Sequence, residues 1–351
     1  MLSYRITEWG EPLEAFAEPT PDPQGTEVLL RVEACGVCHS DLHIWDGYFD
    51  MGDGKKITLA ERGVALPFTM GHEIVGEVVA LGPDAEGAEL GDKRVAFPWI
   101  GCRHCAHCER GEDLMCLSPQ FLGTRVHGGY SDHVMVPHPK YLIDYEGVPR
   151  NLACTYACAG ITAYSALKKI APLDEEDYFV IIGAGGVGLS AVHIARAMLR
   201  GKMIVADIDG TKRAAARQAG AVETIDNSAP DAIKKLRELT GGGAAATLDF
   251  VGAPATSRFG IDALRKGGTH VVVGLYGDAL PLSLPLFPFK LMTMRGSYTG
   301  TLEEMGELMT LVKAGKVPPI PVEPRPLAEA TRTLTDLREG RILGRVVLTA
   351  G

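Results

Sequence analysis

The cysteines give the clearest indication of chemistry in this chain, because four of the eight lie within positions 102–116. They follow the pattern Cys102-x2-Cys105-x2-Cys108-x7-Cys116. Four thiolates complete a tetrahedral zinc shell and leave no position for a substrate, so this spacing predicts a structural zinc site. Two disulfides or an iron–sulfur cluster are the alternatives, and disulfides would require an oxidising compartment.

Three further zinc-binding residue types are spread along the chain: Cys38, His72 and Cys158. Two thiolates and one imidazole would leave a fourth coordination position open, which is typical of a catalytic zinc. Spacing alone does not show that the three converge, since each could be a buried small residue or a satisfied core histidine. Cys154 is the rival for the third ligand.

A glycine-rich stretch, 183–188, has the pattern G-x-G-x-x-G and joins the apolar run 178–182 to a helical segment. Glycines in such a loop allow a tight turn and close approach to a pyrophosphate, and the helix N-terminus attracts the phosphates. Asp207 follows the next expected strand, where a carboxylate can bind ribose hydroxyls. It favours NAD over NADP, although Lys212 and Arg213 keep NADP open. The alternative is a structural turn and a surface aspartate.

The secondary structure expected around these residues changes near position 156. Before it, short β-type runs such as 28–32 and 74–79 alternate with glycine turns, which indicates a mostly β domain. After it, strand-like runs alternate with alanine-rich helical segments, which predicts a parallel sheet covered by helices. The expected strands of that sheet are 178–182, 202–206, 246–251 and 270–274.

Bulk composition narrows the function. A chain of 351 residues with 46% hydrophobic residues predicts two globular domains. A formal net charge of −9 argues against nucleic acid or an anionic membrane as the main partner. No apolar run reaches the ~18 residues of a membrane helix. The N-terminus shows no secretory signal, so we expect a cytoplasmic protein.

Taken together, the motifs resemble the zinc-containing medium-chain alcohol dehydrogenases. The matching segments occur in that family's order and span nearly the whole chain: 38–43 (CHSDLH), 71–73 (GHE), 102–116, 158–164 (CAGITAY) and 183–188. The resemblance implies a two-domain α/β protein. A GroES-like, mostly β catalytic domain would comprise 1–157 and 298–351, with the structural zinc lobe at 100–117. A Rossmann domain with a doubly wound parallel sheet would comprise 158–297.

The resemblance also implies that Cys38, His72 and Cys158 do converge, and it assigns roles around them. Ser40 resembles the hydroxyl that takes the substrate's proton, and His43 the imidazole that passes that proton to solvent. Asp41 resembles the carboxylate that orients the zinc-bound histidine, and Glu73 a transient zinc ligand. Alternatively, Ser40 and Asp41 could simply cap a helix.

For the cofactors, the resemblance implies NAD and two zinc ions per subunit. His39 and Arg345 would face the pyrophosphate, and Thr162 the nicotinamide. The full set of implied NAD contacts is His39, Thr162, Gly183, Gly185, Gly186, Val187, Gly188, Asp207, Lys212, Val273 and Arg345.

The function implied is reversible hydride transfer between a primary or secondary alcohol, cyclic alcohols included, and NAD. Trp45, Phe49, Trp99 and Tyr130 are expected pocket walls. Four alternatives remain: a polyol dehydrogenase, a hydroxyacyl-CoA dehydrogenase that uses lysines of the 50–64 loop, a zinc-free quinone reductase and a non-enzymatic zinc module. Without a long insertion after Cys116, the chain resembles the tetrameric microbial enzymes of the family more than the dimeric ones, so the resemblance implies a homotetramer, with a homodimer as the alternative.

Overall fold

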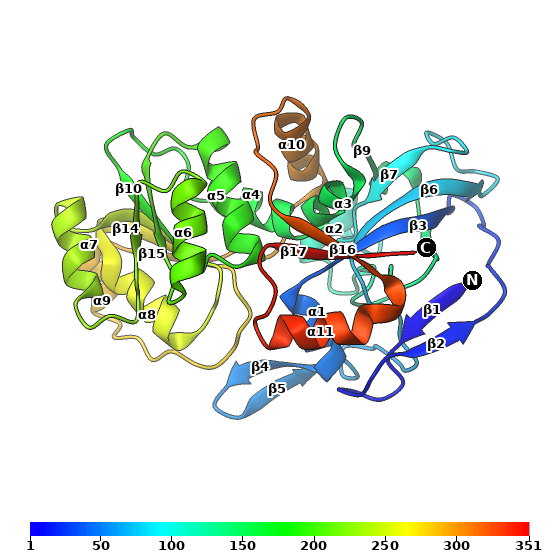
Figure 1. Ribbon diagram of the computed structural model, residues 1–351, viewed down its shortest axis with the longest axis horizontal. Helices are drawn as coiled ribbons and strands as arrows, with labels where there is room; N and C mark the ends of the chain where they lie inside the picture. Colours follow the sequence, from blue (N-terminus) through cyan, green and yellow to red (C-terminus); the bar gives the residue numbers. More distant parts are fainter. Residues whose placement is uncertain (351) are drawn as a thin grey trace. The chain divides into compact units, whose positions relative to one another are not determined.

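The computed structural model describes residues 1–350, which divide into two compact units. Unit 1 comprises Met1–Tyr48, Ile57–Ile161 and the segment from Gly300 onward, and unit 2 comprises Phe49–Lys56 and Thr162–Thr299. Unit 1 is therefore assembled from three separate stretches of chain (Figure 1).

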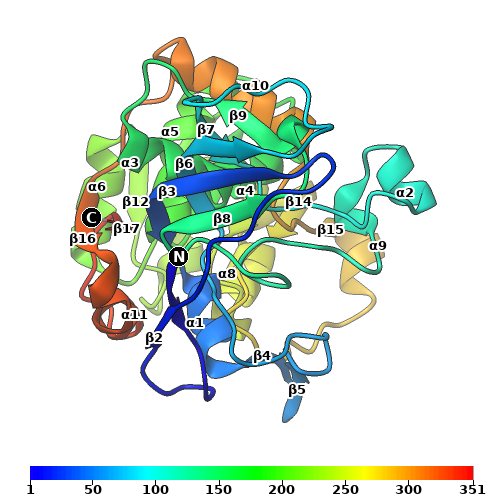
Figure 2. The ribbon, with the colours of Figure 1, turned by 90° about the vertical axis from the view of Figure 1, so that its right-hand side faces the viewer.

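Unit 1 is built on a seven-stranded sheet with the order β16-β17-β3-β6-β7-β9, and β8 also pairs with β3. The long strand β3 is almost fully buried and pairs antiparallel with β6 along one edge. Its other edge is shared, by β8 along the first half and by β17 along the second (Figure 2). The strands are β3 (Val28–Val37), β6 (Glu73–Leu81), β7 (Lys93–Ala96), β8 (His133–Val136), β9 (Leu142–Asp144), β16 (Val322–Pro326) and β17 (Arg345–Thr349).

The remaining elements of unit 1 are short or peripheral. A two-stranded sheet is formed by β1 (Leu2–Arg5) and β2 (Glu14–Ala17). Its helices are α1 (His39–Asp46), α2 (Ala106–Glu109), α3 (Arg150–Ala153), α10 (Leu302–Lys313) and α11 (Ala330–Arg338), and α4 (Ala159–Lys168) begins in unit 1 and continues into unit 2.

Unit 2 contains a six-stranded, all-parallel sheet with the order β12-β11-β10-β13-β14-β15. This is the doubly wound order of the Rossmann fold, so the predicted fold class is confirmed. Its strands are β10 (Tyr178–Ile182), β11 (Lys202–Ala206), β12 (Glu223–Ile225), β13 (Ala244–Asp249), β14 (Leu264–Val272) and β15 (Thr293–Gly296).

Helices cover both faces of this sheet. In Figure 1, α5 and α6 lie on one side of the strands and α7 and α8 on the other. Ala232, Leu236 and Phe259 from α7 and α8 pack on buried strand residues such as Val180 and Ile204. The helices are α5 (Gly186–Met198), α6 (Gly210–Gln218), α7 (Ala232–Thr240), α8 (Pro254–Ala263) and α9 (Leu286–Lys290).

A β-hairpin, β4 (Tyr48–Gly52) and β5 (Lys55–Thr58), follows α1 along the chain. Residues 49–56 lie within the stretch expected to form the first domain, and they cluster with unit 2. Here the two backbones approach closely: a Cβ on Gly52 would collide with the backbone nitrogen of Ala279, and one on Gly277 would lie 3.0 Å from the backbone oxygen of Asp50. The hairpin is therefore tied to the loop that follows β14.

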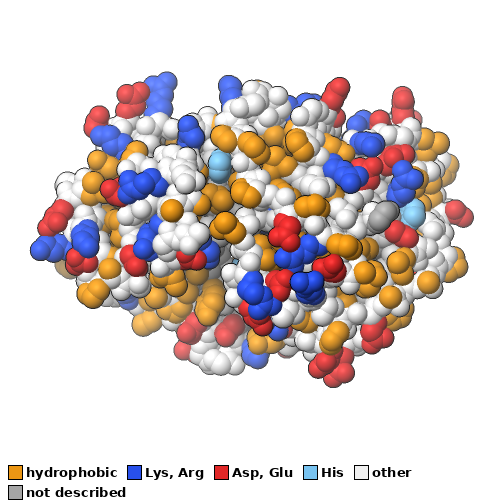
Figure 3. All heavy atoms as spheres, in the orientation of Figure 1, with side chains coloured by type: hydrophobic (Ala, Val, Ile, Leu, Met, Phe, Trp, Pro, Cys, Tyr) orange, Lys and Arg blue, Asp and Glu red, His pale blue; other side chains and the backbone are white. Residues whose placement is uncertain are grey.

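Within residues 1–350, no helix combines the length and the apolar character that a membrane crossing requires. On the face drawn in Figure 3, acidic and basic side chains are interspersed.

Candidate metal centres and nucleotide site

The turn between β3 and α1 carries the first group of predicted site residues. Cys38 is the N-cap of α1, and its backbone N–H donates to the Asp41 carboxylate at 3.0 Å. Asp41 therefore caps the helix, as one of the two sequence interpretations held. Ser40 and His43 lie three residues apart on the same helix and are both partly exposed, whereas Cys38 and Asp41 are buried.

Three buried ligand atoms converge beside this turn. The Sγ of Cys38, a ring nitrogen of His72 and the Sγ of Cys158 all lie within 4.8 Å of one another. The Cys38 Sγ and His72 Nε2 atoms are 3.1 Å apart. Cys154 is not part of this group, because its thiol donates to the carbonyl of Asn151 at 3.3 Å. A soft set of two sulfurs and one imidazole suits zinc and leaves room for a fourth ligand.

Buried side chains surround His72. Its Nδ1 lies 3.2 Å from Asp41 Oδ1, and the Tyr130 hydroxyl donates to Asp41 Oδ2 at 3.3 Å. The Trp99 ring stands 5.5 Å from the His72 ring, and its indole N–H donates to the carbonyl of Ala157. Tyr130 and Trp99, expected as pocket walls, are thus buried supports of the ligand set.

Trp45, another expected pocket wall, faces elsewhere. Its indole N–H donates to the carbonyl of Glu11, and the Arg338 guanidinium lies 4.4 Å over its ring. Trp45 is only 5% exposed, so it packs α1 against α11.

Glu73, which follows His72, is completely buried and forms an ion pair with Arg345 of β17. Its other carboxylate oxygen accepts from the backbone N–H of Ala159 at 3.3 Å. The Nε of Arg345 is buried and has no partner in the described structure. Sequence reasoning gave Glu73 and Arg345 separate roles and missed their pairing, because no local pattern links residues 272 positions apart.

The pKa values of these residues are shifted, because charged groups lie close together in a buried space. The hydrogen bond from the Cys158 thiol lowers the pKa of Cys38 well below its ordinary value, although burial opposes the change. Burial lowers the pKa of His72, but the negative charges of Cys38 and Asp41 and the hydrogen bonds to both residues together outweigh it, so the net shift is upward. Burial raises the pKa of Glu73 to about 7 against the opposing effect of Arg345. Such a cluster of interacting buried groups is typical of functional sites.

The four clustered cysteines of unit 1 form the second centre. Their Sγ atoms all lie within 4.8 Å of one another, with separations of 3.5 Å for Cys105–Cys108 and 3.9 Å for both Cys102–Cys108 and Cys105–Cys116. Zinc–sulfur bonds of about 2.3 Å in a tetrahedron give sulfur–sulfur edges of about 3.8 Å. All four cysteines are free, so the disulfide alternative does not describe this cluster.

The glycine-rich loop connects β10 to α5 in unit 2. Gly183 has φ +87°, which favours glycine, and a side chain on Gly188 would collide with the Gly183 carbonyl. Nothing lies within 4 Å of where a Cβ on Gly185 would be, so the first turn of α5 is open to a ligand. At the end of β11, Asp207 accepts from Ala184 N at 2.7 Å and from Asp209 N at 2.8 Å.

The other residues expected to bind the cofactor occupy varied positions. Gly186 and Val187 begin α5, Lys212 lies in the first turn of α6, and Val273 directly follows β14. His39 is exposed at the start of α1, and Thr162 is partly buried in α4.

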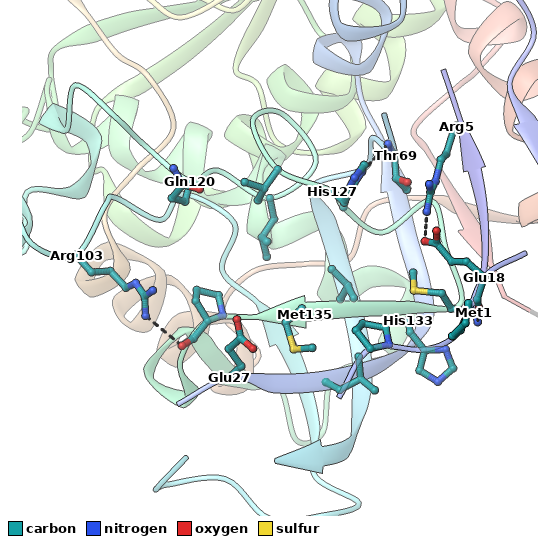
Figure 4. Close-up of a pocket in the computed structure, with 18 residues that line it drawn as sticks. Met1, Arg5, Glu18, Glu27, Thr69, Arg103, Gln120, His127, His133 and Met135 are labelled. Carbon is teal, nitrogen blue, oxygen red and sulfur yellow. Dashed lines mark hydrogen bonds and ion pairs between the residues drawn. The ribbon is translucent and has the colours of Figure 1, made fainter. Parts of the chain in front are cut away.

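One cavity of about 540 Å³ lies in unit 1 (Figure 4). Its lining mixes apolar side chains such as Leu122 and Met135 with the Arg5–Glu18 ion pair and His127. None of its lining residues belongs to the metal centres or to the nucleotide loop.

Two models of known protein families match the chain, each mainly within one of the two units. Residues 24–146 match the alcohol dehydrogenase GroES-like domain, and residues 186–314 match the zinc-binding dehydrogenase family. The chain is 36% identical to an NAD-dependent alcohol dehydrogenase of Sulfurisphaera tokodaii and 36% identical to one of Saccharolobus solfataricus. Each match covers 99% of this chain and 99% of the relative.

Solved structures of related enzymes superpose on 99% or more of the chain. The alcohol dehydrogenase of Aeropyrum pernix superposes with a TM-score of 0.90 at 31% identity, over 100% of both chains. The acetophenone reductase of Geotrichum candidum, solved with NAD, gives a TM-score of 0.85 at 29% identity, over 99% of this chain and 97% of that one.

Proposed function

The chain belongs to the zinc-binding medium-chain alcohol dehydrogenases, and from this membership we propose that Cys38, His72 and Cys158 hold its catalytic zinc. It is an NAD-linked oxidoreductase that interconverts an alcohol and its aldehyde or ketone. The observation that carries the proposal is the convergence of two thiols and one imidazole within 4.8 Å, all buried beside Asp41.

When bound, zinc supplies a Lewis acid that lowers the pKa of an alcohol hydroxyl, and NAD supplies the hydride acceptor. Ser40 takes the alcohol's proton and hands it to His43, which lies on the same face of α1 at i, i+3. Burial lowers the pKa of His43, so its imidazole is neutral near pH 7 and can accept that proton. Asp41 holds the His72 ring in one orientation.

Glu73 and Arg345 form the second layer of the proposed site. Arg345 is paired with Glu73, and its buried Nε has no partner in the described structure. The guanidinium can therefore bind a nearby phosphate, or release Glu73 when that residue moves toward the metal. We therefore propose that Arg345 contacts the pyrophosphate and that Glu73 is a transient ligand of the metal.

NAD is proposed to bind along the glycine-rich loop and Asp207. The open position at Gly185 and the N-terminus of α5 suit the pyrophosphate. Asp207 accepts two backbone N–H groups, which hold its carboxylate in place at the end of β11, and a carboxylate there would disfavour a 2′-phosphate. The other proposed contacts are His39, Thr162, Gly183, Gly186, Val187, Gly188, Lys212 and Val273.

We also propose a second, structural zinc at the four clustered cysteines, because their sulfur–sulfur separations fit a tetrahedral shell. The substrate is proposed to be a primary or secondary alcohol. Eight free cysteines suit a reducing compartment, and a cytoplasmic location is proposed on that ground.

A homo-oligomer, a tetramer or a dimer, is proposed as the working assembly. Strand β15 ends the parallel sheet, and all four of its residues are exposed. Phe289 and Leu291, just before it, are 78% and 64% exposed. An open strand edge with apolar neighbours is a surface that a second copy can cover about a two-fold axis.

The proposal is tested by metal analysis and turnover together. The purified protein should hold two zinc ions per chain and reduce NAD with a panel of primary, secondary and cyclic alcohols. The Cys158→Ser variant should hold one zinc ion and lose turnover, whereas Cys154→Ser should keep both zinc ions and its activity. One metal per wild-type chain, confined to the four clustered cysteines, would contradict the proposal.

A further inference from the structure

Tyr130 is a buried polar residue to which the proposed chemistry gives no part. Its side chain has no solvent exposure, and its hydroxyl donates to Asp41 Oδ2 at 3.3 Å. The other oxygen of that carboxylate lies 3.2 Å from His72 Nδ1, and His72 Nε2 lies 3.1 Å from Cys38 Sγ. The hydroxyl thus stands at the end of a short chain of contacts that leads to the ligand set.

The Tyr130 backbone is bonded to the segment that carries His72. Tyr130 N donates to the Met70 carbonyl at 2.9 Å, and Gly129 N donates to the Gly71 carbonyl at 2.8 Å. Gly71, next to His72, has φ +97°, and a side chain there would collide with the Tyr130 ring. The phenol ring therefore fills the space that this glycine leaves, and its position is set relative to His72.

The Asp41 carboxylate receives two donors on one oxygen. The Cys38 backbone N–H, at 3.0 Å, and the Tyr130 hydroxyl both reach Oδ2. With Oδ2 occupied from two directions, rotation of the carboxylate would break both bonds, so Oδ1 stays toward the imidazole. Outer partners of this kind orient a metal-binding histidine and fix its tautomer.

We propose that Tyr130 is a positioning residue for the catalytic metal, whose hydroxyl locks Asp41 and thereby holds His72 Nε2 toward Cys38 and Cys158. This inference rests on the proposed catalytic zinc. It assigns Tyr130 no contact with substrate or cofactor; its effect passes through Asp41.

The test is the rate at which zinc leaves the purified two-zinc protein in the presence of a chelator and a chromogenic zinc dye. Tyr130→Phe removes one oxygen and keeps the ring that packs on Gly71, so the variant should fold normally. We expect zinc to leave the Cys38 site about tenfold faster than in the wild type, the lower end of the range for outer-shell partners. Zinc at the four clustered cysteines should leave at the wild-type rate.

Tyr141→Phe is the matched control. Tyr141 is an equally buried tyrosine, and its hydroxyl lies 3.4 Å from an aspartate oxygen, Asp113 Oδ1, beside the four-cysteine lobe. This variant should release zinc from the Cys38 site at the wild-type rate. If both tyrosine variants accelerate release equally, Tyr130 has no special link to that site and the inference is wrong.

A double-mutant cycle tests whether the effect passes through Asp41. Asp41→Asn should accelerate zinc release at least as much as Tyr130→Phe, and the double variant should release zinc no faster than Asp41→Asn alone. A full, additive effect of Tyr130→Phe in the Asp41→Asn background would overturn the inference.

The two proposals fail in different ways. If the wild type holds no second zinc, the proposed catalytic site itself is wrong. If it holds two zinc ions and Tyr130→Phe releases them at the wild-type rate, only the role of Tyr130 is wrong.

Discussion

The N-terminus of α1 shows how one side chain serves two purposes. Asp41 accepts from the Cys38 backbone and so caps the helix, and the same carboxylate faces His72. The sequence presented these roles as alternatives, because a carboxylate at the third helical position suits both. The structure combines them: the cap places Cys38 and Asp41 on the side of the turn that faces His72.

Ser40 supplies the first residue-level prediction. Ser40→Ala should lower kcat by about 100-fold or more, because a positioned proton acceptor contributes about 10²–10⁴-fold to a rate. Ser40→Thr keeps the hydroxyl and should keep most of the activity. Stopped-flow measurement of NAD reduction, with zinc content measured in parallel, checks this. Full activity in the alanine variant would remove Ser40 from the proton path.

His270 in β14 supplies a prediction on pH. It is fully buried, its Nδ1 lies 2.8 Å from the Thr247 hydroxyl, and its Nε2 has no partner in the described structure. Burial lowers its pKa below the ordinary 6.5. The folded state therefore binds fewer protons than the unfolded state below about pH 6.5, and stability falls as pH drops from there toward the folded-state pKa.

His270→Gln should therefore flatten the dependence of Tm on pH from about pH 6.5 downward, whatever its effect on Tm at pH 8. Differential scanning calorimetry at several pH values measures this slope. His193→Gln, at a half-buried histidine whose pKa is also lowered, is the comparison and should flatten the slope less. An unchanged slope in His270→Gln would contradict the expectation.

Local sequence patterns were sufficient to predict those secondary-structure elements and clusters whose residues follow one another in the chain. The apolar run, glycine loop and helix at 178–198 follow one another in the chain, and so do the four clustered cysteines; both groups form as the sequence predicts. The convergence of Cys38, His72 and Cys158 depends on the pairing of β3 with β6 and on the turn before α4, which no local pattern encodes. Only resemblance to a family indicated it.

The β4–β5 hairpin gives an element-level prediction. Gly52→Ala should destabilise the hairpin's attachment to Ala279, because the new methyl group meets that residue at a distance shorter than any normal contact. Overpacking of this kind costs about 1–3 kcal/mol. Limited proteolysis should then cut the hairpin faster than in the wild type.

Gly54→Ala is the matched control for this hairpin. Gly54 also has a positive φ, +72° against +82° at Gly52, but nothing lies within 4 Å of its Cβ position. Both variants bear the backbone strain, and only Gly52→Ala bears the clash. Equal cleavage rates in the two variants would show that the approach to Ala279 does not hold the hairpin.

For the whole molecule, the open edge of the parallel sheet predicts how copies associate. Met294→Glu adds a charge in β15 and should lower the assembly mass measured by sedimentation, because burying an unpaired carboxylate in an interface is costly. Val222→Glu, beside the opposite edge strand β12, is the control and should leave the mass unchanged. A wild-type monomer, or an unchanged mass in Met294→Glu, would contradict the proposed use of this edge.

The pairing of β17 with β3 joins residues about 300 positions apart, Val346 and Val37 among them. During translation at about 5–20 residues per second, β3 emerges roughly 15–60 seconds before its partner exists. For that time the second half of β3, which ends next to Cys38, has no β17 strand to pair with. Glu73 also lacks its ion-pair partner, Arg345. The sheet of unit 1 can therefore be completed only after the whole of unit 2 has been synthesised.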